Sequence, residues 1–429
     1  MSTAGKDHQV VFSTDGHCGA DLWDYKPYLE QRYHDAFDVW ANGFHDAWAE
    51  GTDQDRDANH RVGVASMMAP LNWDARMRLE YLDSQGIAAE VLFPNTAPPF
   101  YPSGALTAAG PRNAEEYELR FAGLRAHNRW LVDFCSEAPD RWAGFAQVFL
   151  DDVDDAVAEA RAAKAGGLRG ILLPNDHVLR MANLYYPHLD PLWEVCAELE
   201  LPVHRHTNFP TESVAEGGNA AALIGMVEMQ FYVVRAIGHM ILSGVFERHP
   251  SLVFVITEIT SASEIPAYLA RLDGMLRMSS MGDGTPLVEH IADALGALRR
   301  TPSEYFATNC YVAGPTHDLR QAHDAGVPNL MWGADVPHSE GTSPFTLEAL
   351  QTVMWDLPES DLNDLLATRA AKVYDFDLDS LQSIADRIGP TVEQIKTPLA
   401  AEDRPKFPQD TRCTIFNQQT APLLKTADR

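Results

Sequence analysis

Short apolar runs that alternate with longer helical patterns constrain this chain more than any other feature of its sequence. Between the runs lie helix patterns such as WDARMRLEYLDSQG, which ends at Gly86. Its Trp73, Met77 and Tyr81 recur every four positions, as residues on one helix face do. Strands that alternate with helices indicate a parallel sheet, and eight of them predict an α/β protein with a (β/α)8 TIM barrel. The eight candidate strands are residues 9–17, 88–94, 142–150, 168–174, 201–207, 252–258, 305–312 and 329–337.

The length of the chain, 429 residues, is about twice that of a typical domain, but barrels of this kind reach it as one unit. Two regions exceed the minimal barrel. Residues 18–87 form an insertion after the first strand, which we expect near the active-site mouth as a lid or an oligomer contact. Residues 390–429 contain several prolines and little periodicity, which predicts an extended tail. We therefore expect a barrel domain at 1–389, including the insertion, and a C-terminal extension at 390–429.

The charge balance excludes two classes of partner. The chain has 33 basic and 61 acidic residues, a net charge of −28, so nucleic acid and anionic lipid are not expected partners. Its 5 cysteines are widely spaced without a CxxC pair, and we expect neither a secretory signal nor a membrane-spanning segment. We expect a cytoplasmic protein that acts on a small molecule.

Polar residues stand where the apolar runs stop, and in a (β/α)8 barrel the C-terminal ends of the strands carry the catalytic groups. Asp15 and His17 are two positions apart, a spacing that points both side chains of a strand to the same face. His204 and His206 repeat this spacing on the fifth strand. The polar residues at the ends of the runs are Asp15, His17, Asn95, Asn175, His204, His206, Glu258, Asn309, Asp335 and His338.

Each of these residues alone has a purely structural explanation: a hydrogen-bonded Asp–His turn, a core histidine, or, for Asp335, a helix cap or an ion pair. Taken together, four of them would converge at one end of the barrel with Glu258 beside them, namely Asp15, His17, His206 and Asp335. Three carboxylates that face one lumen repel one another, and a divalent cation removes that repulsion. Nitrogen and oxygen ligands suit Zn2+, Mn2+ or Fe2+. The sequence therefore predicts a metal site.

The chain also resembles the amidohydrolase superfamily, in the "amidohydrolase 2" branch that includes aminocarboxymuconate semialdehyde decarboxylase and the resorcylate-type decarboxylases. The resemblance covers residues 9 to 375. It starts with Asp-x-His followed by DLW at 21–23, and it continues through WDARMRLEYLDSQGIAAEVLFPN, HNRWLVDFCSEAPDRWAGFAQV, YYPHLDPLWEVCAELELPVHRHTN, SGVFERHPSLVFVITE and MWGADVPHSEG.

This resemblance implies a role for each matching position. Asp15 and His17 would be the metal pair of the first strand, and His206 the ligand from the fifth. Asp335 would be the ligand from the eighth strand and the residue that moves protons. His204 lies earlier on its strand and would support the site. We expect Zn2+, with Mn2+ or Fe2+ as alternatives, and a homodimer or higher homo-oligomer.

Two departures from the family pattern concern the mechanism. Many relatives have a histidine where this chain has Glu258, which could bind metal, act as an acid or base, or orient another group. The first loop, DGHCGADLW, is two residues shorter than usual and lacks the Glu-Pro before DLW, so it cannot make the contact of that acid.

The expected function is metal-dependent decarboxylation of a hydroxylated aromatic or unsaturated carboxylic acid. Asp335, when protonated, would deliver a proton to the carbon that loses CO2. Glu258 or His204 would hold a substrate hydroxyl, and Asn95 would contact the substrate. His338 would either contact the substrate or pack in its loop.

Two other functions fit the same residues. A metal-dependent hydrolase of an amide, lactone or carbon–carbon bond would use the metal to activate water, with Asp335 as its proton acceptor. A non-catalytic binding protein that kept the barrel is the third, although the filled ligand positions argue against it.

Overall fold

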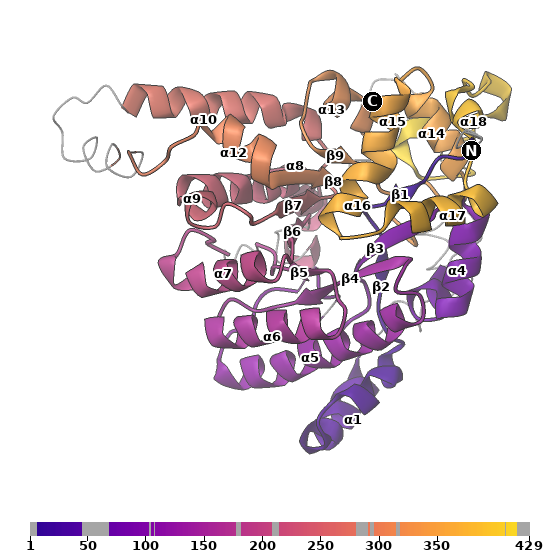
Figure 1. Cartoon of the computed structure of the whole chain (residues 1–429). Helices are drawn as coiled ribbons and strands as arrows, with labels where there is room; N and C mark the ends of the chain where they lie inside the picture. Colours follow the sequence, from indigo (N-terminus) through magenta and orange to yellow (C-terminus); the bar gives the residue numbers. More distant parts are fainter. Residues whose placement is uncertain are drawn as a thin grey trace, which may run out of the picture.

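The chain folds into a closed barrel of parallel strands with helices around it (Figure 1). The structure, a computed structural model, describes residues 7–44, 68–102, 104–106, 108–176, 182–207, 214–279, 291, 296–314, 318–407 and 409–417. The strands are β1 (Phe12–Ser13), β2 (His17–Cys18), β3 (Ala89–Pro94), β4 (Trp142–Gln147), β5 (Gly170–Leu172), β6 (Val203–His206), β7 (Phe254–Thr257), β8 (Cys310–Ala313) and β9 (Leu330–Met331).

Two short strands, β1 and β2, share the first position of the barrel, because both pair with β3. The order then follows the chain from β3 to β9, and every pairing is parallel. The backbone N–H of Thr14 donates to Trp332 O at 2.8 Å, which closes the last strand onto the first. The predicted (β/α)8 barrel is confirmed.

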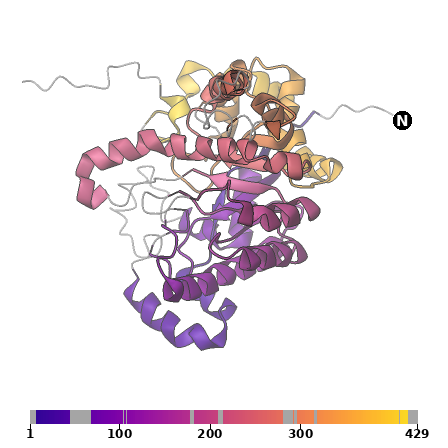
Figure 2. The same ribbon diagram turned by 90° about the vertical axis from the view of Figure 1, so that its left-hand side faces the viewer.

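The helices lie outside the strands (Figure 1), and the long helix α8 crosses the molecule and extends beyond the barrel (Figure 2). The α-helices are α1 (His34–Gly43), α4 (Ala75–Ser84), α5 (Ala114–Ser136), α6 (Val153–Ala165), α7 (Asp190–Glu198), α8 (Val214–Leu242), α9 (Val245–Arg248), α10 (Ile265–Ser279), α12 (Pro302–Asn309), α13 (Leu319–Asp324), α14 (Thr346–Met354), α15 (Glu359–Asn363), α16 (Arg369–Val373), α17 (Leu378–Ile388) and α18 (Val392–Lys396). Within the described ranges, no helix combines the length and the apolarity that a membrane span requires.

Alternation along each strand produces two apolar layers. On β3, Val91 and Phe93 point into the barrel, where they pack with Phe145 of β4. Leu92 points outward and packs with helix residues such as Leu131 of α5. The barrel interior is therefore a packed core, and chemistry is confined to its ends.

The predicted strand at 305–312 is wrong in its first half, which belongs to helix α12. The cap explains the error: the side chain of Thr301 accepts from Glu304 N, and the Glu304 side chain accepts from the backbone N–H of Thr301. The strand starts only at Cys310. Asn309 consequently lies at the N-terminal end of β8, where its amide donates to the carbonyls of Pro250 and Leu252, and not at the predicted site.

The described part of the insertion consists of α1, α4 and three 3-10 helices, Leu22–Tyr28, Gln31–Tyr33 and Ala69–Asn72. Residues 45–67 of it lie outside the described residues. The predicted tail begins with a bridge between Thr391 and His8, followed by α18. Its Cys413 and Phe416 are buried against Ala349 of α14, so the tail packs on the outside of the barrel.

Candidate metal centre

Backbone pairing brings the two ends of the barrel sequence together at the site. The N–H of His17 donates to Val336 O at 2.7 Å, and the N–H of Asp335 donates to Asp15 O at 2.9 Å. The first-strand and eighth-strand segments are therefore neighbours. His206 enters from the C-terminal end of β6, where it is paired with Thr257 of β7.

The side chains at this junction approach one another closely. His17 Nε2 lies 3.1 Å from Asp335 Oδ1 and 3.5 Å from Asp15 Oδ1. His206 Nε2 lies 3.6 Å from Asp15 Oδ1. All four residues are buried. The structure thus brings together the four side chains that the sequence predicted as ligands, and we call them the metal cluster: Asp15, His17, His206 and Asp335.

Several polar atoms of the metal cluster are buried without a hydrogen bond among the described residues, although some of them lie at ion-pair distances from one another. These atoms are both carboxylate oxygens of Asp15, both ring nitrogens of His17, Nε2 of His206 and Oδ1 of Asp335. Buried polar atoms without partners cost free energy. One ligand atom from each of Asp15, His17 and His206 lies within 4.8 Å of the others, so one cation can satisfy them. The donor set fits a divalent metal ion.

The carboxylates and imidazoles at the cluster shift one another's pKa values. Burial alone would lower the pKa of His17, but the carboxylates of Asp15 and Asp335 raise it to about 9. Burial would raise the pKa of Asp335, yet His338 and His17 hold it below its usual range. Without an ion, the proton on His17 supplies the positive charge that the carboxylates need. A bound cation would replace that proton, because a histidine ligand must be neutral.

Glu258 touches the cluster: its Oε2 lies 3.3 Å from His206 Nε2. Burial and the nearby carboxylates of Asp335 and Asp15 raise the pKa of Glu258. Both Glu258 and Asp335 adopt left-handed backbone conformations, with φ of 58° and 59°. Such strain costs on the order of 1 kcal/mol or more per residue and is found preferentially at functional sites.

A second acidic group lies at the outer side of the cluster. Glu258, Asp335 and Glu340 each place one oxygen within 4.8 Å of the others. The sequence prediction missed Glu340, which follows Asp335 in an irregular loop. Its only signal was that position, five residues after the predicted ligand.

His338 and Asn95 form a chain of contacts at the rim. His338 Nδ1 lies 2.8 Å from Asp335 Oδ1, and its Nε2 lies 3.2 Å from Asn95 Oδ1. The Asn95 amide donates to Asn72 Oδ1 at 2.7 Å. Asn72, which was not predicted, belongs to the insertion, so the insertion reaches the site. The His338 ring also stacks on His17, with centroids 4.0 Å apart.

His204 lies one layer deeper in the barrel. Its Nδ1 is 3.2 Å from Ile171 O and its Nε2 is 3.2 Å from the hydroxyl of Tyr374. Its ring stacks on Phe145 at 3.8 Å, and burial lowers its pKa to about 3. Between the two histidines, Arg205 points the other way and pairs with Asp176 at 2.8 Å.

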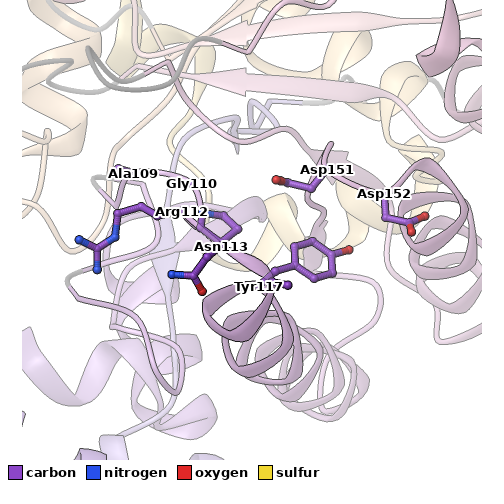
Figure 3. Close-up of a pocket in the computed structure, with 9 residues that line it drawn as sticks. Ala109, Gly110, Arg112, Asn113, Tyr117, Asp151 and Asp152 are labelled. Carbon is purple, nitrogen blue, oxygen red and sulfur yellow. The ribbon is translucent and has the colours of Figure 1, made fainter.

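A cavity of about 640 Å³ opens beside the barrel mouth, between the start of α5 and the loop after β4 (Figure 3). Tyr117 projects from α5 on one side, and Asp151 and Asp152 lie on the other. No residue of the metal cluster lines this cavity. Asn175, another residue predicted at a strand end, donates to Leu106 O near this region and does not join the cluster.

Comparison with known proteins gives consistent matches. A family model described as "Amidohydrolase" matches residues 85–376. A gamma-resorcylate decarboxylase from Rhodococcus jostii (strain RHA1) is 27% identical over 208 residues, which span 46% of this chain and 59% of that relative.

Among solved structures, 5-carboxyvanillate decarboxylase LigW from Sphingomonas paucimobilis superposes with a TM-score of 0.58 at 20% identity, covering 86% of this chain and 99% of that chain. The 5-carboxyvanillate decarboxylase from Novosphingobium aromaticivorans DSM 12444, in complex with manganese and 4-hydroxy-3-methoxy-5-nitrobenzoic acid, gives a TM-score of 0.61 at 19% identity and covers 87% of this chain and 98% of that chain. Both likenesses show the same fold.

Proposed function

Because this chain belongs to the amidohydrolase family, we propose that it is a metal-dependent decarboxylase of a hydroxylated aromatic or unsaturated carboxylic acid. The observation that carries the proposal is the buried metal cluster, in which ligand atoms of Asp15, His17 and His206 lie within 4.8 Å of one another and lack hydrogen bonds among the described residues. The similarity to gamma-resorcylate and 5-carboxyvanillate decarboxylases supports decarboxylation over the alternative, hydrolysis.

Asp15, His17, His206 and Asp335 would hold the metal. When bound, the ion would supply positive charge that holds the substrate carboxylate and an adjacent oxygen and spreads the developing negative charge. The donor set fits Zn2+, which we expected, and equally Mn2+, which the Novosphingobium structure contains. Metal analysis of the purified protein identifies the ion.

The reaction breaks the bond between a substrate carbon and CO2, and that carbon must then receive a proton. Asp335 lies in the cluster and would donate it. Because His338 and His17 lower the pKa of Asp335, Asp335 would first have to accept this proton from a neighbouring acid. Glu258 lies beside it, and burial and the nearby carboxylates raise the pKa of Glu258, which favours its protonated form. Glu258 would therefore resupply the proton to Asp335 or hold a substrate hydroxyl.

The surrounding residues would position the substrate. Phe93 packs edge-on against His206, with centroids 4.7 Å apart, and would hold the His206 ring in place from the barrel core. Asn95 and His338 would contact polar groups of the substrate at the rim. His204, one layer deeper with both nitrogens occupied, would support the site without touching the substrate.

The test is incubation of the metal-loaded protein in heavy water with 2,6-dihydroxybenzoate and 5-carboxyvanillate. We expect CO2 release and one deuterium at the vacated carbon. Both Asp335→Asn and Glu258→Gln should lower kcat by about 100-fold or more, the size expected for a lost proton transfer, whereas Glu359→Gln on the surface of α15 should have no effect. Water consumption without CO2 would instead establish the hydrolase alternative.

We also propose that the protein forms a homo-oligomer and is located in the cytoplasm. Helix α8 exposes Leu223, Val227 and Phe231, spaced four apart, with 66%, 78% and 65% of each side chain accessible. Such an apolar face can pack against its own copy in a two-fold dimer. Light scattering measures the mass in solution, and a monomer would refute this part.

A further inference from the structure

A buried ion pair lies directly behind the metal cluster. Arg78 of α4 and Glu90 of β3 are both fully buried and form a two-pronged contact, Nε to Oε1 at 2.7 Å and Nη2 to Oε2 at 2.8 Å. The indole N–H of Trp142 also donates to Glu90 Oε1 at 3.0 Å. Glu90 points outward from β3, so the pair lies between the sheet and the helices.

The guanidinium of Arg78 continues to the backbone of the cluster. Its Nη1 donates to His17 O at 2.6 Å and to Leu71 O at 2.9 Å, and its Nη2 donates to Val336 O at 3.1 Å. His17 is a metal-cluster residue, and Val336 follows Asp335. One side chain therefore ties together the two segments, from opposite ends of the barrel sequence, that carry these ligands.

The Arg78–Glu90 pair also explains why the residue between Asp15 and His17 is a glycine. A Cβ at Gly16 would lie 2.9 Å from Glu90 Oε2 and 3.2 Å from Arg78 Nη2. Only a residue without a side chain lets this part of the first strand approach the ion pair so closely. Gly16 also forms the parallel bridge to Val336.

We propose that the Arg78–Glu90 pair is a positioning unit that sets the separation of His17 and Asp335 for metal binding. Glu90 fixes the plane of the guanidinium, and the guanidinium fixes the carbonyls of His17 and Val336. Metal affinity depends on ligand distances within about 0.2 Å, so small movements of either segment weaken binding. This inference rests on the metal site of the proposed function but not on its reaction.

A purely structural role is the competing explanation, since a buried ion pair could simply anchor α4 to the sheet. The two roles differ in what happens when both charges are removed. Replacing a buried ion pair by neutral residues of similar size is often close to neutral for stability. A positioning role predicts that such a protein folds and still binds metal poorly.

The experiment compares Arg78→Met/Glu90→Gln with the wild-type protein. The glutamine keeps an acceptor for Trp142, and no charge is left unpaired. Titration of the chelator-treated proteins with Mn2+ by calorimetry should give a Kd at least tenfold weaker for the double variant, while its melting temperature stays close to that of wild type. Arg78→Lys should keep the charge pair but not both carbonyl contacts, and should weaken Mn2+ binding to an intermediate degree.

Arg169 provides a matched control, because its guanidinium also donates to backbone carbonyls, those of Tyr374 and Asp375, at the opposite end of the barrel. Arg169→Met should leave the Mn2+ affinity unchanged. A double variant that folds and binds Mn2+ within twofold of wild type would overturn the proposal, and so would equal weakening by Arg169→Met. Mn2+ binding by wild type without CO2 release would refute only the proposed reaction.

Discussion

Two histidines on one strand show how the two layers of the barrel interior differ. His204 and His206 point to the same side of β6, about 7 Å apart along the strand. Both ring nitrogens of His204 lie 3.2 Å from a protein oxygen. Nε2 of His206 is buried without a hydrogen-bond partner among the described residues and faces Asp15 and Glu258.

The difference lies in the neighbours that each layer supplies. The lower layer offers Phe145, Tyr374 and the carbonyl of Ile171, so His204 is satisfied by the protein alone. The upper layer offers carboxylates and a second imidazole, whose lone pairs need a cation. A buried layer with an incomplete set of hydrogen bonds indicates a site, and a layer with a complete set indicates a core.

Replacing the two histidines separately should give the largest effect. We expect His206→Asn to lower the bound metal to a trace and to reduce kcat/KM by about 1000-fold or more, because a direct ligand is lost. Metal content by mass spectrometry and steady-state rates measure both.

The matching change in the lower layer is His204→Phe. It should cost about 1–3 kcal/mol of stability through two lost hydrogen bonds, while metal content and kcat/KM stay within about tenfold of wild type. A large loss of kcat with full metal content would instead show that His204 acts directly in catalysis.

Removing the metal should have the next largest effect. A ligand at 100 times its Kd stabilises the folded state by about 2.7 kcal/mol, so chelation should lower the melting temperature of wild type and of His204→Phe. His206→Asn should melt at one temperature with or without chelator. A metal-dependent shift in His206→Asn would place the ion somewhere other than the metal cluster.

The smallest effect concerns another buried histidine, which does not belong to the metal cluster. Burial lowers the pKa of His127 on α5 to about 3, and its Nδ1 is 2.9 Å from the Tyr25 hydroxyl. The folded state therefore holds the neutral ring, while the unfolded chain protonates near pH 6.5. The neutral His127 ring therefore contributes fully to the free energy of unfolding above pH 6.5. This contribution falls as the pH decreases toward 3, by about 2 kcal/mol between pH 7.5 and 5.

The measurement is the free energy of unfolding of the metal-free protein across this pH range. His127→Gln should reduce the loss of unfolding free energy between pH 7.5 and 5 by about 2 kcal/mol. The same change at the exposed His188 should leave that loss unchanged. An unchanged slope in His127→Gln would mean that folding does not shift the pKa of this ring.

Much of this architecture could be predicted from local patterns. Apolar runs separated by capped helices predicted the barrel, and polar residues at the ends of those runs predicted four side chains that the structure brings together. The strand at 305–312 failed because the capping box at Thr301 and Glu304 outweighed the β-propensity of the residues after it. The balance between helix capping and β-propensity in so short a segment is hard to predict without knowing the tertiary packing around it.

Other parts of the site depend on contacts between distant segments, which no local pattern contains. Glu340 and Asn72 carry no periodic signal, and their approach to the site follows from loop paths. Glu90 stands out in the sequence, because it is an acid inside the apolar run AAEVLFP. The sequence does not show which residue pairs with it. Only the folded chain places Arg78 against it.

Except for Asn309, the sequence by itself determined which residues lie at the C-terminal ends of the strands, because the apolar runs mark the strands and strand periodicity fixes the direction of each side chain. The tertiary structure alone decided which of them lack partners, since that depends on what neighbouring strands place opposite. His204 and His206 have the same spacing and direction in the sequence. They differ because the ring nitrogens of His204 meet a carbonyl and a hydroxyl, whereas Nε2 of His206 faces the carboxylates of Asp15 and Glu258.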